Sequence, residues 1–84
     1  NQMVYFGVTS VTTNDEGVAH VSHAKLTGKN FMAICIPDTP RAAAGCVVTN
    51  PTADGFDILV IDKNGVCLKN VSLWIRYVAV SNYY

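Results

Sequence analysis

The chain of 84 residues is 50% hydrophobic and only 14% charged, and its six basic and six acidic residues cancel. It has no cluster of Lys and Arg among aromatic residues, which argues against binding of nucleic acid through a basic surface. No apolar run reaches the ~18 residues that would span a bilayer, so no membrane insertion is expected. Because charged side chains normally cover the solvent side, their shortage indicates that other copies of the chain cover part of the outer surface.

In chain order, residues 1–12 have apolar side chains on both faces and predict a β-strand, or an extended lead-in from a preceding domain. We therefore expect residues 1–16 to form this strand or lead-in and residues 17–84 to form a β-sandwich. The start at Asn1 without an initiator methionine is typical of a fragment or a processed product. Thr13–Gly17 predicts a turn, because Asn, Asp and Gly tolerate the left-handed backbone of a tight reversal.

The middle of the chain predicts three strands. Gly17–His23 is the first of them, and the polar segment Lys25–Asn30 after it is expected to be a loop. Phe31–Ile36 is a nearly continuous apolar run ended by Pro37, which predicts a strand in the middle of a core. Ala42–Thr49 predicts a strand whose small residues allow another sheet or subunit to approach closely. Turns are predicted at residues 38–41 and 50–55.

The last part of the chain predicts a hairpin. Two β-rich runs, Gly55–Asp62 and Val66–Val80, flank Lys63-Asn64-Gly65, and Asn-Gly between hydrophobic runs is a strong hairpin signal. Both runs carry apolar residues on both faces of the pleat, so each face is expected to be covered by protein. Since no segment has helical spacing over more than about two turns, the fold class is predicted as all-β, either a small six-stranded antiparallel sandwich or a small barrel.

The cysteines and histidines predict no cofactor. Cys35, Cys46 and Cys67 are odd in number and lack the close spacing of a zinc site, which indicates buried free thiols and assembly in a reducing cytoplasm. One disulfide with a thiol left over is the alternative. His20 and His23 fall on opposite faces of a strand and are expected to be surface or half-buried residues. A metal held by three copies of one histidine at a three-fold axis is the alternative.

Catalysis has no sequence signal, so we expect a non-enzymatic protein. The acidic residues fall mostly in turns, and there is no nucleophile elbow, phosphate loop or calcium loop. Two loop carboxylates acting as a glycosidase remain the enzymatic alternative. Trp74 is expected to anchor a core or a subunit interface rather than a sugar. Loops on a rigid β frame usually carry specificity, so the candidate ligand-binding residues are Asp38, Arg41, Asp62, Lys63 and Asn64, with Tyr83 near the end of the chain as a further candidate.

Three short motifs carry a family resemblance. They are the turn Thr52-Ala53-Asp54-Gly55-Phe56 entering a strand, the closing strand ending in Tyr77-Val78-Ala79-Val80, and Gly17–His23, which matches a "G-x-a-x-V-x-H" strand. Over roughly Gly17 to Val80 the chain resembles the H-type lectin fold and the related C-terminal receptor-binding domains of bacteriophage tail fibres and tail spikes. Tyr77 stands where the closing strand of the family usually has Trp.

The resemblance implies a six-stranded antiparallel sandwich that assembles as a homotrimer, with sugars bound near subunit boundaries by the loop before the last strand. By position that loop is Asp62–Gly65. We therefore expect a virion protein, assembled in the host cytoplasm, whose tip domain recognises a host surface glycan or protein receptor. A trimerisation or capping module of a fibre, a secreted H-type-like lectin and a small polysaccharide hydrolase are the alternatives.

Overall fold

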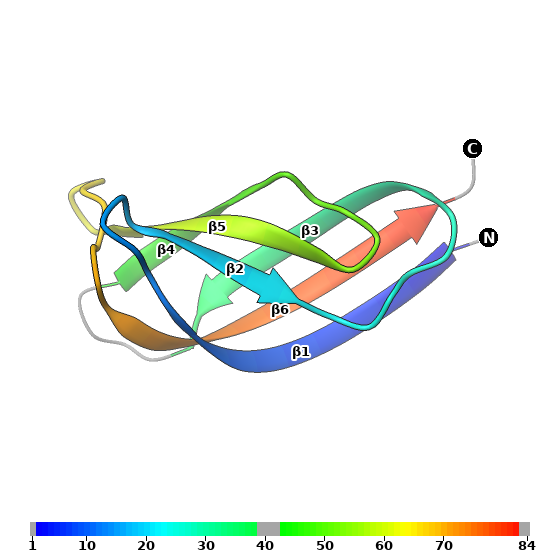
Figure 1. The fold of residues 1–84 in the computed structure, drawn as a ribbon, viewed down its shortest axis with the longest axis horizontal. Coiled ribbons are helices and arrows are strands. Elements are labelled where there is room, and N and C mark those ends of the chain that lie inside the picture. Colours follow the sequence, from blue (N-terminus) through cyan, green and yellow to red (C-terminus); the bar gives the residue numbers. More distant parts are fainter. Residues whose placement is uncertain (1, 39–42, 83–84) are drawn as a thin grey trace.

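The computed structural model describes residues 2–38 and 43–82, which form six β-strands in two stacked antiparallel sheets (Figure 1). The prediction of an all-β fold with six strands in an antiparallel sandwich is confirmed. The sheet orders are β1-β6-β3 and β2-β5-β4. The strands are β1 (Gln2–Thr12), β2 (Val18–Ser22), β3 (Lys29–Pro37), β4 (Ala43–Thr49), β5 (Gly55–Asp62) and β6 (Ser72–Asn82).

The predicted hairpin between the last two strands is wrong beyond its first residues. The chain does reverse after Asp62, where the Gly65 N–H donates to the Asp62 carbonyl at 3.0 Å. Strand β6 begins only at Ser72, however, and lies between β1 and β3, whereas β5 lies between β2 and β4. The reason is non-local: β1 offers β6 a partner over all eleven of its residues, and a continued hairpin would leave β1 unpaired. The Asn-Gly signal fixes only the turn.

The core lies between the sheets and is built from alternate residues of each strand. Phe56, Ile58 and Val60 of β5 are 0 to 1% exposed, as expected for one face of a strand in the middle of a sheet. Their neighbours in the core cluster are Val11, Ala19, Val21, Cys35, Leu73, Ile75 and Tyr77. Burial of side chains of this size stabilises a fold by about 1.5 to 3 kcal/mol each, so the core is the main source of stability.

The prediction that Phe31–Ile36 lies in the middle of a core is wrong. Strand β3 is an edge strand, and only one set of its alternate residues faces the other sheet. Met32, Ile34 and Ile36 point outward and are 56%, 67% and 57% exposed. A continuous apolar run therefore did not mark a strand covered on both sides within one chain.

The turns are held by short polar side chains, as predicted. The Asn14 Oδ1 accepts the N–H groups of Glu16 and Val18 at 2.8 and 3.1 Å. Asn50, in a predicted turn, adopts a left-handed backbone angle with φ of 56°, which asparagine tolerates better than most residues. Asn70 has φ of 54° and interrupts the run Val66–Val80 that was predicted as one strand, and its N–H and side-chain amide donate to the distant Asn14 and Asp15.

The Thr52–Phe56 motif has a clear structural role. The Thr52 hydroxyl donates to the Gly55 carbonyl at 2.9 Å and closes the turn. A Cβ atom on Gly55 would lie 2.6 Å from the Val21 carbonyl oxygen, so glycine is required for β2 to approach β5. Phe56 then enters the core at 1% exposure. The motif therefore supports the fold, whatever ligand the chain binds.

Candidate functional site

The most unusual surface of the molecule is the outer side of the β1-β6-β3 sheet. The strand register aligns its outward side chains in three rows across the sheet. The rows are Val4 with Val80 and Met32, Phe6 with Val78 and Ile34, and Val8 with Arg76 and Ile36. Trp74 follows on β6, opposite Ser10. We call this surface, made by Val4, Phe6, Val8, Met32, Ile34, Ile36, Trp74, Val78 and Val80, the apolar face.

The apolar face is strongly exposed in the single chain. Phe6 is 73% exposed, and Ile34, on the other side of Val78 in the middle row, is 67% exposed. A shallow hollow of about 540 Å³ lies over the middle of the sheet and is bordered by Phe6, Val8, Ile34, Ile36, Arg76 and Val78. Soluble monomers rarely expose contiguous apolar patches of this kind, so the face is a candidate interaction surface.

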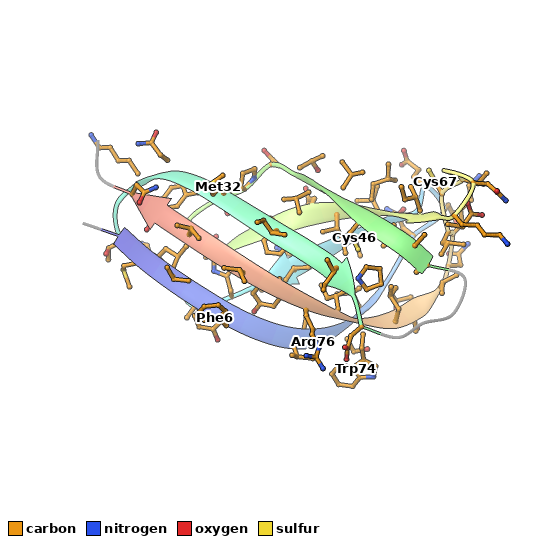
Figure 2. The ribbon with its side chains drawn as sticks, turned by 180° about the vertical axis from the view of Figure 1, so that it is seen from behind. Phe6, Met32, Cys46, Cys67, Trp74 and Arg76 are labelled. Atoms are coloured by element: carbon orange, nitrogen blue, oxygen red, sulfur yellow. The ribbon has the colours of Figure 1, made fainter. Side chains whose placement is uncertain are left out.

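Arg76 brings one positive charge into the apolar face, and its own chain neutralises it. Its Nε donates to the Asp38 Oδ1 at 2.6 Å, and the side chains of Arg76 and Asp38 are 62% and 33% exposed. Asp38 is held in place because its backbone N–H donates to the Trp74 carbonyl at 2.8 Å. Figure 2 shows Arg76 and Trp74 extending outward from β6. The charge is therefore balanced before any partner approaches.

Three of the predicted ligand-binding residues, Asp62, Lys63 and Asn64, form one tight turn after β5. The Asp62 Oδ1 accepts the N–H groups of Asn64 and Val66 at 2.8 and 3.0 Å, which commits this oxygen to the turn. Lys63 and Asn64 are exposed. Figure 1 shows this turn at the end of the sandwich opposite both chain ends. The turn is thus a rigid projection that presents Lys63 and Asn64 to the surroundings.

The other predicted ligand-binding residues are not brought into this turn. Asp38 follows β3 and pairs with Arg76. Arg41 and Tyr83 lie outside the described residues. The structure therefore groups Asp62, Lys63 and Asn64 and assigns Asp38 to the rim of the apolar face.

The two histidines lie on opposite sides of their sheet, as predicted. The His20 Nδ1 is 2.7 Å from the Asp57 Oδ1 on the outer side. The His23 ring lies 6.0 Å from the Phe56 ring and 6.2 Å from the Tyr77 ring on the inner side. Among the residues described, no three His, Cys, Asp or Glu side chains come together as a possible metal site. The described part of the chain also contains no helix that could cross a membrane.

Tyr77 links the core to the candidate site. A Cβ on Gly7 would lie 2.3 Å from the Tyr77 ring, so the glycine lets this ring lie across β1. Burial, with a smaller contribution from Tyr5, raises the pKa of the Tyr77 hydroxyl. The predicted strand containing Gly7 is confirmed, and the cross-strand contact explains why it contains a glycine.

Sequence reasoning did not place Arg76 or the hollow at a site. The available signal was the apolar side chains on both faces of the strands. This pattern indicated that other protein covers part of the surface, but it did not show which strands form that surface. Only the pairing of β6 between β1 and β3 puts these side chains side by side. The prediction that Trp74 anchors a core is not met, since it is 51% exposed, and an interface role remains for it.

Comparisons with protein-family models, curated proteins and solved structures found no match to this chain.

Proposed function

We propose that this chain is a non-enzymatic recognition domain that acts as a homotrimer, with its apolar face between subunits and its end turns directed to a host surface glycan or protein receptor. The tip of a bacteriophage tail fibre or spike is the setting that the family resemblance favours. The single observation that carries the proposal is the exposed apolar face, because a lone chain gains nothing from presenting it to water.

The size of the apolar face supports an interface. The exposed fractions of its seven most exposed members add up to about four whole side chains, and at about 150 to 250 Å² for each this is roughly 600 to 1,000 Å². Stable interfaces bury about 800 Å² per partner, whereas the largest patch on a typical monomer is about 300 to 600 Å². The apolar face is therefore large enough to hold copies of the chain together.

The charge on the apolar face also supports self-association. A buried unpaired charge would oppose association strongly. Arg76 already has Asp38 as its partner within one chain, so copies can pack together without leaving a charge unpaired. In a closed three-fold ring each face meets its neighbours in the same way, and no apolar face is left over to form filaments.

Recognition by the trimer would use its end turns. Asp62 fixes the backbone of the turn through two hydrogen bonds, and the exposed Lys63 and Asn64 then offer a cation and an amide to a ligand. Three copies of a weak site in one trimer increase binding by avidity, provided that the three sites reach the same surface. A weak single site is consistent with the presence of only two exposed polar side chains, Lys63 and Asn64, in the turn.

The test is the state of association of a matched pair of variants. Phe6→Asp places a charge in the middle row of the apolar face, and Val47→Asp places one on the outer side of the other sheet, where Val47 is 46% exposed. We expect the unmodified chain and Val47→Asp to sediment as trimers at micromolar concentration and Phe6→Asp to sediment as a folded monomer. A well-folded, unmodified chain that sediments as a monomer would overturn the proposal.

The capping module is the second candidate function, and the geometry of Asp62 favours it. One oxygen of this predicted ligand-binding carboxylate is already bonded to the backbone of its own turn. The double variant Lys63→Ala/Asn64→Ala separates the two functions in binding to an array of bacterial surface polysaccharides. Loss of binding with the trimer intact supports recognition. Unchanged adsorption of the parent fibre, with assembly dependent on this domain, supports capping.

A further inference from the structure

Two cysteines from different sheets meet in the interior of the sandwich. Cys35 on β3 is 5% exposed, and Cys46 on β4 is half-buried and packs against the same core cluster. Strands β3 and β4 are edge strands of their sheets and are in contact. All three cysteines are free. Figure 2 shows Cys46 on β4 and Cys67 at the end of the sandwich, so Cys67 is the separate one.

The pair has an asymmetry that suits thiol chemistry. The strand register places Cys35 opposite Tyr77 and Cys46 opposite Val60, so both side chains face the core. Interaction with Cys46, followed by burial, raises the pKa of Cys35 above its ordinary range. The interaction with Cys35 lowers the pKa of Cys46. Cys46 is therefore the thiol of the pair that loses its proton first to give the thiolate, the reactive form of cysteine, and it is the more exposed of the two. Cys35 remains a protonated thiol beside it.

We propose that Cys35 and Cys46 are a reversible thiol modification site that closes into a disulfide between the two sheets when the chain meets a peroxide. This inference is independent of the proposed receptor-binding function. It rests on two free thiols that face each other across the core, one buried and one accessible. No substrate other than hydrogen peroxide or a small alkyl hydroperoxide is required.

The reaction balances in two steps. The Cys46 thiolate attacks one peroxide oxygen, the O–O bond breaks, and Cys46 becomes a sulfenic acid, while hydroxide leaves from hydrogen peroxide or an alkoxide leaves from an alkyl hydroperoxide. The Cys35 sulfur then attacks the Cys46 sulfur, the S–O bond breaks, and water leaves with the proton of the Cys35 thiol. The two sulfur atoms together lose two electrons, which reduce the peroxide. A dithiol reductant restores both thiols.

The cross-link should stabilise the fold. It would join the facing edges of the two sheets and close the segment between residues 35 and 46, which restricts the unfolded chain. For a domain of this size we expect the unfolding temperature to rise by roughly 10 °C. The effect should disappear on reduction.

The experiment is peptide mapping of the full chain after peroxide treatment. The protein is reduced, freed of reductant, treated with a small excess of hydrogen peroxide and then alkylated. Trypsin places Cys35, Cys46 and Cys67 on three different peptides, residues 30–41, 42–63 and 64–69. We expect the first two peptides to be joined by a disulfide and Cys67 to be alkylated, with the rise in unfolding temperature described above.

The variants Cys46→Ser and Cys67→Ser are the matched pair. Cys46→Ser should abolish both the cross-linked peptide and the rise in unfolding temperature, and Cys67→Ser should keep both. The map of the unmodified chain is decisive even if a variant does not fold. Links through Cys67, links between chains, or oxidation of Cys46 to a sulfinic acid without a disulfide would each overturn the inference.

Discussion

The outer faces of the two sheets differ sharply, although their inner faces contribute to one core. On the β2-β5-β4 sheet, the outer row of His20, Asp57 and Thr49 is polar, and the His20 Nδ1 lies 2.7 Å from the Asp57 Oδ1, whereas the outer row of Val18, Leu59 and Val47 is apolar. On the β1-β6-β3 sheet, two full rows are apolar, and the third is apolar except for Arg76. A sheet that faces water should alternate apolar and polar residues. The β1-β6-β3 sheet therefore has the composition of a sheet that is covered on both sides.

The comparison also shows what a low charge content means in this chain. The apolar residues are not spread evenly over the surface, because strands β1, β3 and β6 supply all three rows of the apolar face. Leu59 and Ile61 on the outer side of β5 are half-buried, whereas Phe6 and Ile34 are largely open to water. The difference between the sheets is thus one of exposed apolar area, and the following predictions test this difference and the packing beneath it.

The largest effect on stability is expected from glycine substitutions matched between the two sheets. Gly7→Ala should destabilise the fold by about 2 to 3 kcal/mol, because the new Cβ would lie within 2.6 Å of three Tyr77 side-chain atoms. Gly45→Ala on β4 should change stability by less than about 0.5 kcal/mol, since its nearest neighbour would be Ile61 Cγ1 at 3.9 Å. Urea unfolding measures the free energy of unfolding of both variants. Equal effects would contradict the close packing of Tyr77 against β1 in the β1-β6-β3 sheet.

Alkaline pH should destabilise the chain through the β1-β6-β3 sheet, because Tyr77 lies in β6 and the strands of the β2-β5-β4 sheet contain no tyrosine. Burial raises the pKa of Tyr77 in the folded chain. The unfolded chain therefore releases this proton first, from about pH 10, and binds fewer protons than the folded chain. Stability contributed by Tyr77 is present below pH 10 and is lost as the pH rises toward the folded pKa.

The measurement for Tyr77 is the free energy of unfolding between pH 9 and pH 11. A single group of this kind lowers stability by at most about 1.4 kcal/mol per pH unit. Tyr77→Phe should flatten this dependence, and an unchanged slope would show that other groups cause it.

The Arg76–Asp38 ion pair and the His20–Asp57 contact should contribute little to the difference between the sheets. The side chains of Arg76 and His20 are 62% and 60% exposed, and exposed ion pairs typically contribute about 0.2 to 1 kcal/mol. We expect Arg76→Met and His20→Ala each to change the stability of the monomer by less than about 1 kcal/mol in thermal unfolding. A larger loss for Arg76→Met would mean that the Asp38 pair, rather than the apolar rows, defines the first face.

The smallest effect is expected from salt. An interface made of apolar rows should not weaken when sodium chloride is raised from about 0.1 to 1 M, because screening acts on charges and the Arg76 charge is already paired. Sedimentation at both concentrations should give association constants that agree within about threefold or favour the trimer at high salt. A tenfold weakening would indicate an electrostatic interface.

Much of the site could not be predicted because it depends on pairing between distant strands. The Asn64-Gly65 turn was predicted correctly, since a turn depends on a few adjacent residues. The continuation of the hairpin was wrong, because β6 could pair either with the adjacent β5 or with the distant β1, and local sequence does not rank these choices. Arg76 was missed for the same reason: its neighbours Val8 and Ile36 lie on β1 and β3, which pair with the two sides of β6 and are distant from it in the sequence.

Six strands, the turns at residues such as Asn14 and Asp62, and the division of each strand into two faces could be predicted from the sequence alone. These features follow from the two-residue period of a strand and from the backbone preferences of Asn, Asp and Gly, which are local. The tertiary structure alone decided which faces meet in the core, which form the exposed apolar face, and that Cys35 faces Cys46. Those outcomes depend on the competition among distant segments to bury apolar surface, and that competition is settled only when the whole chain folds.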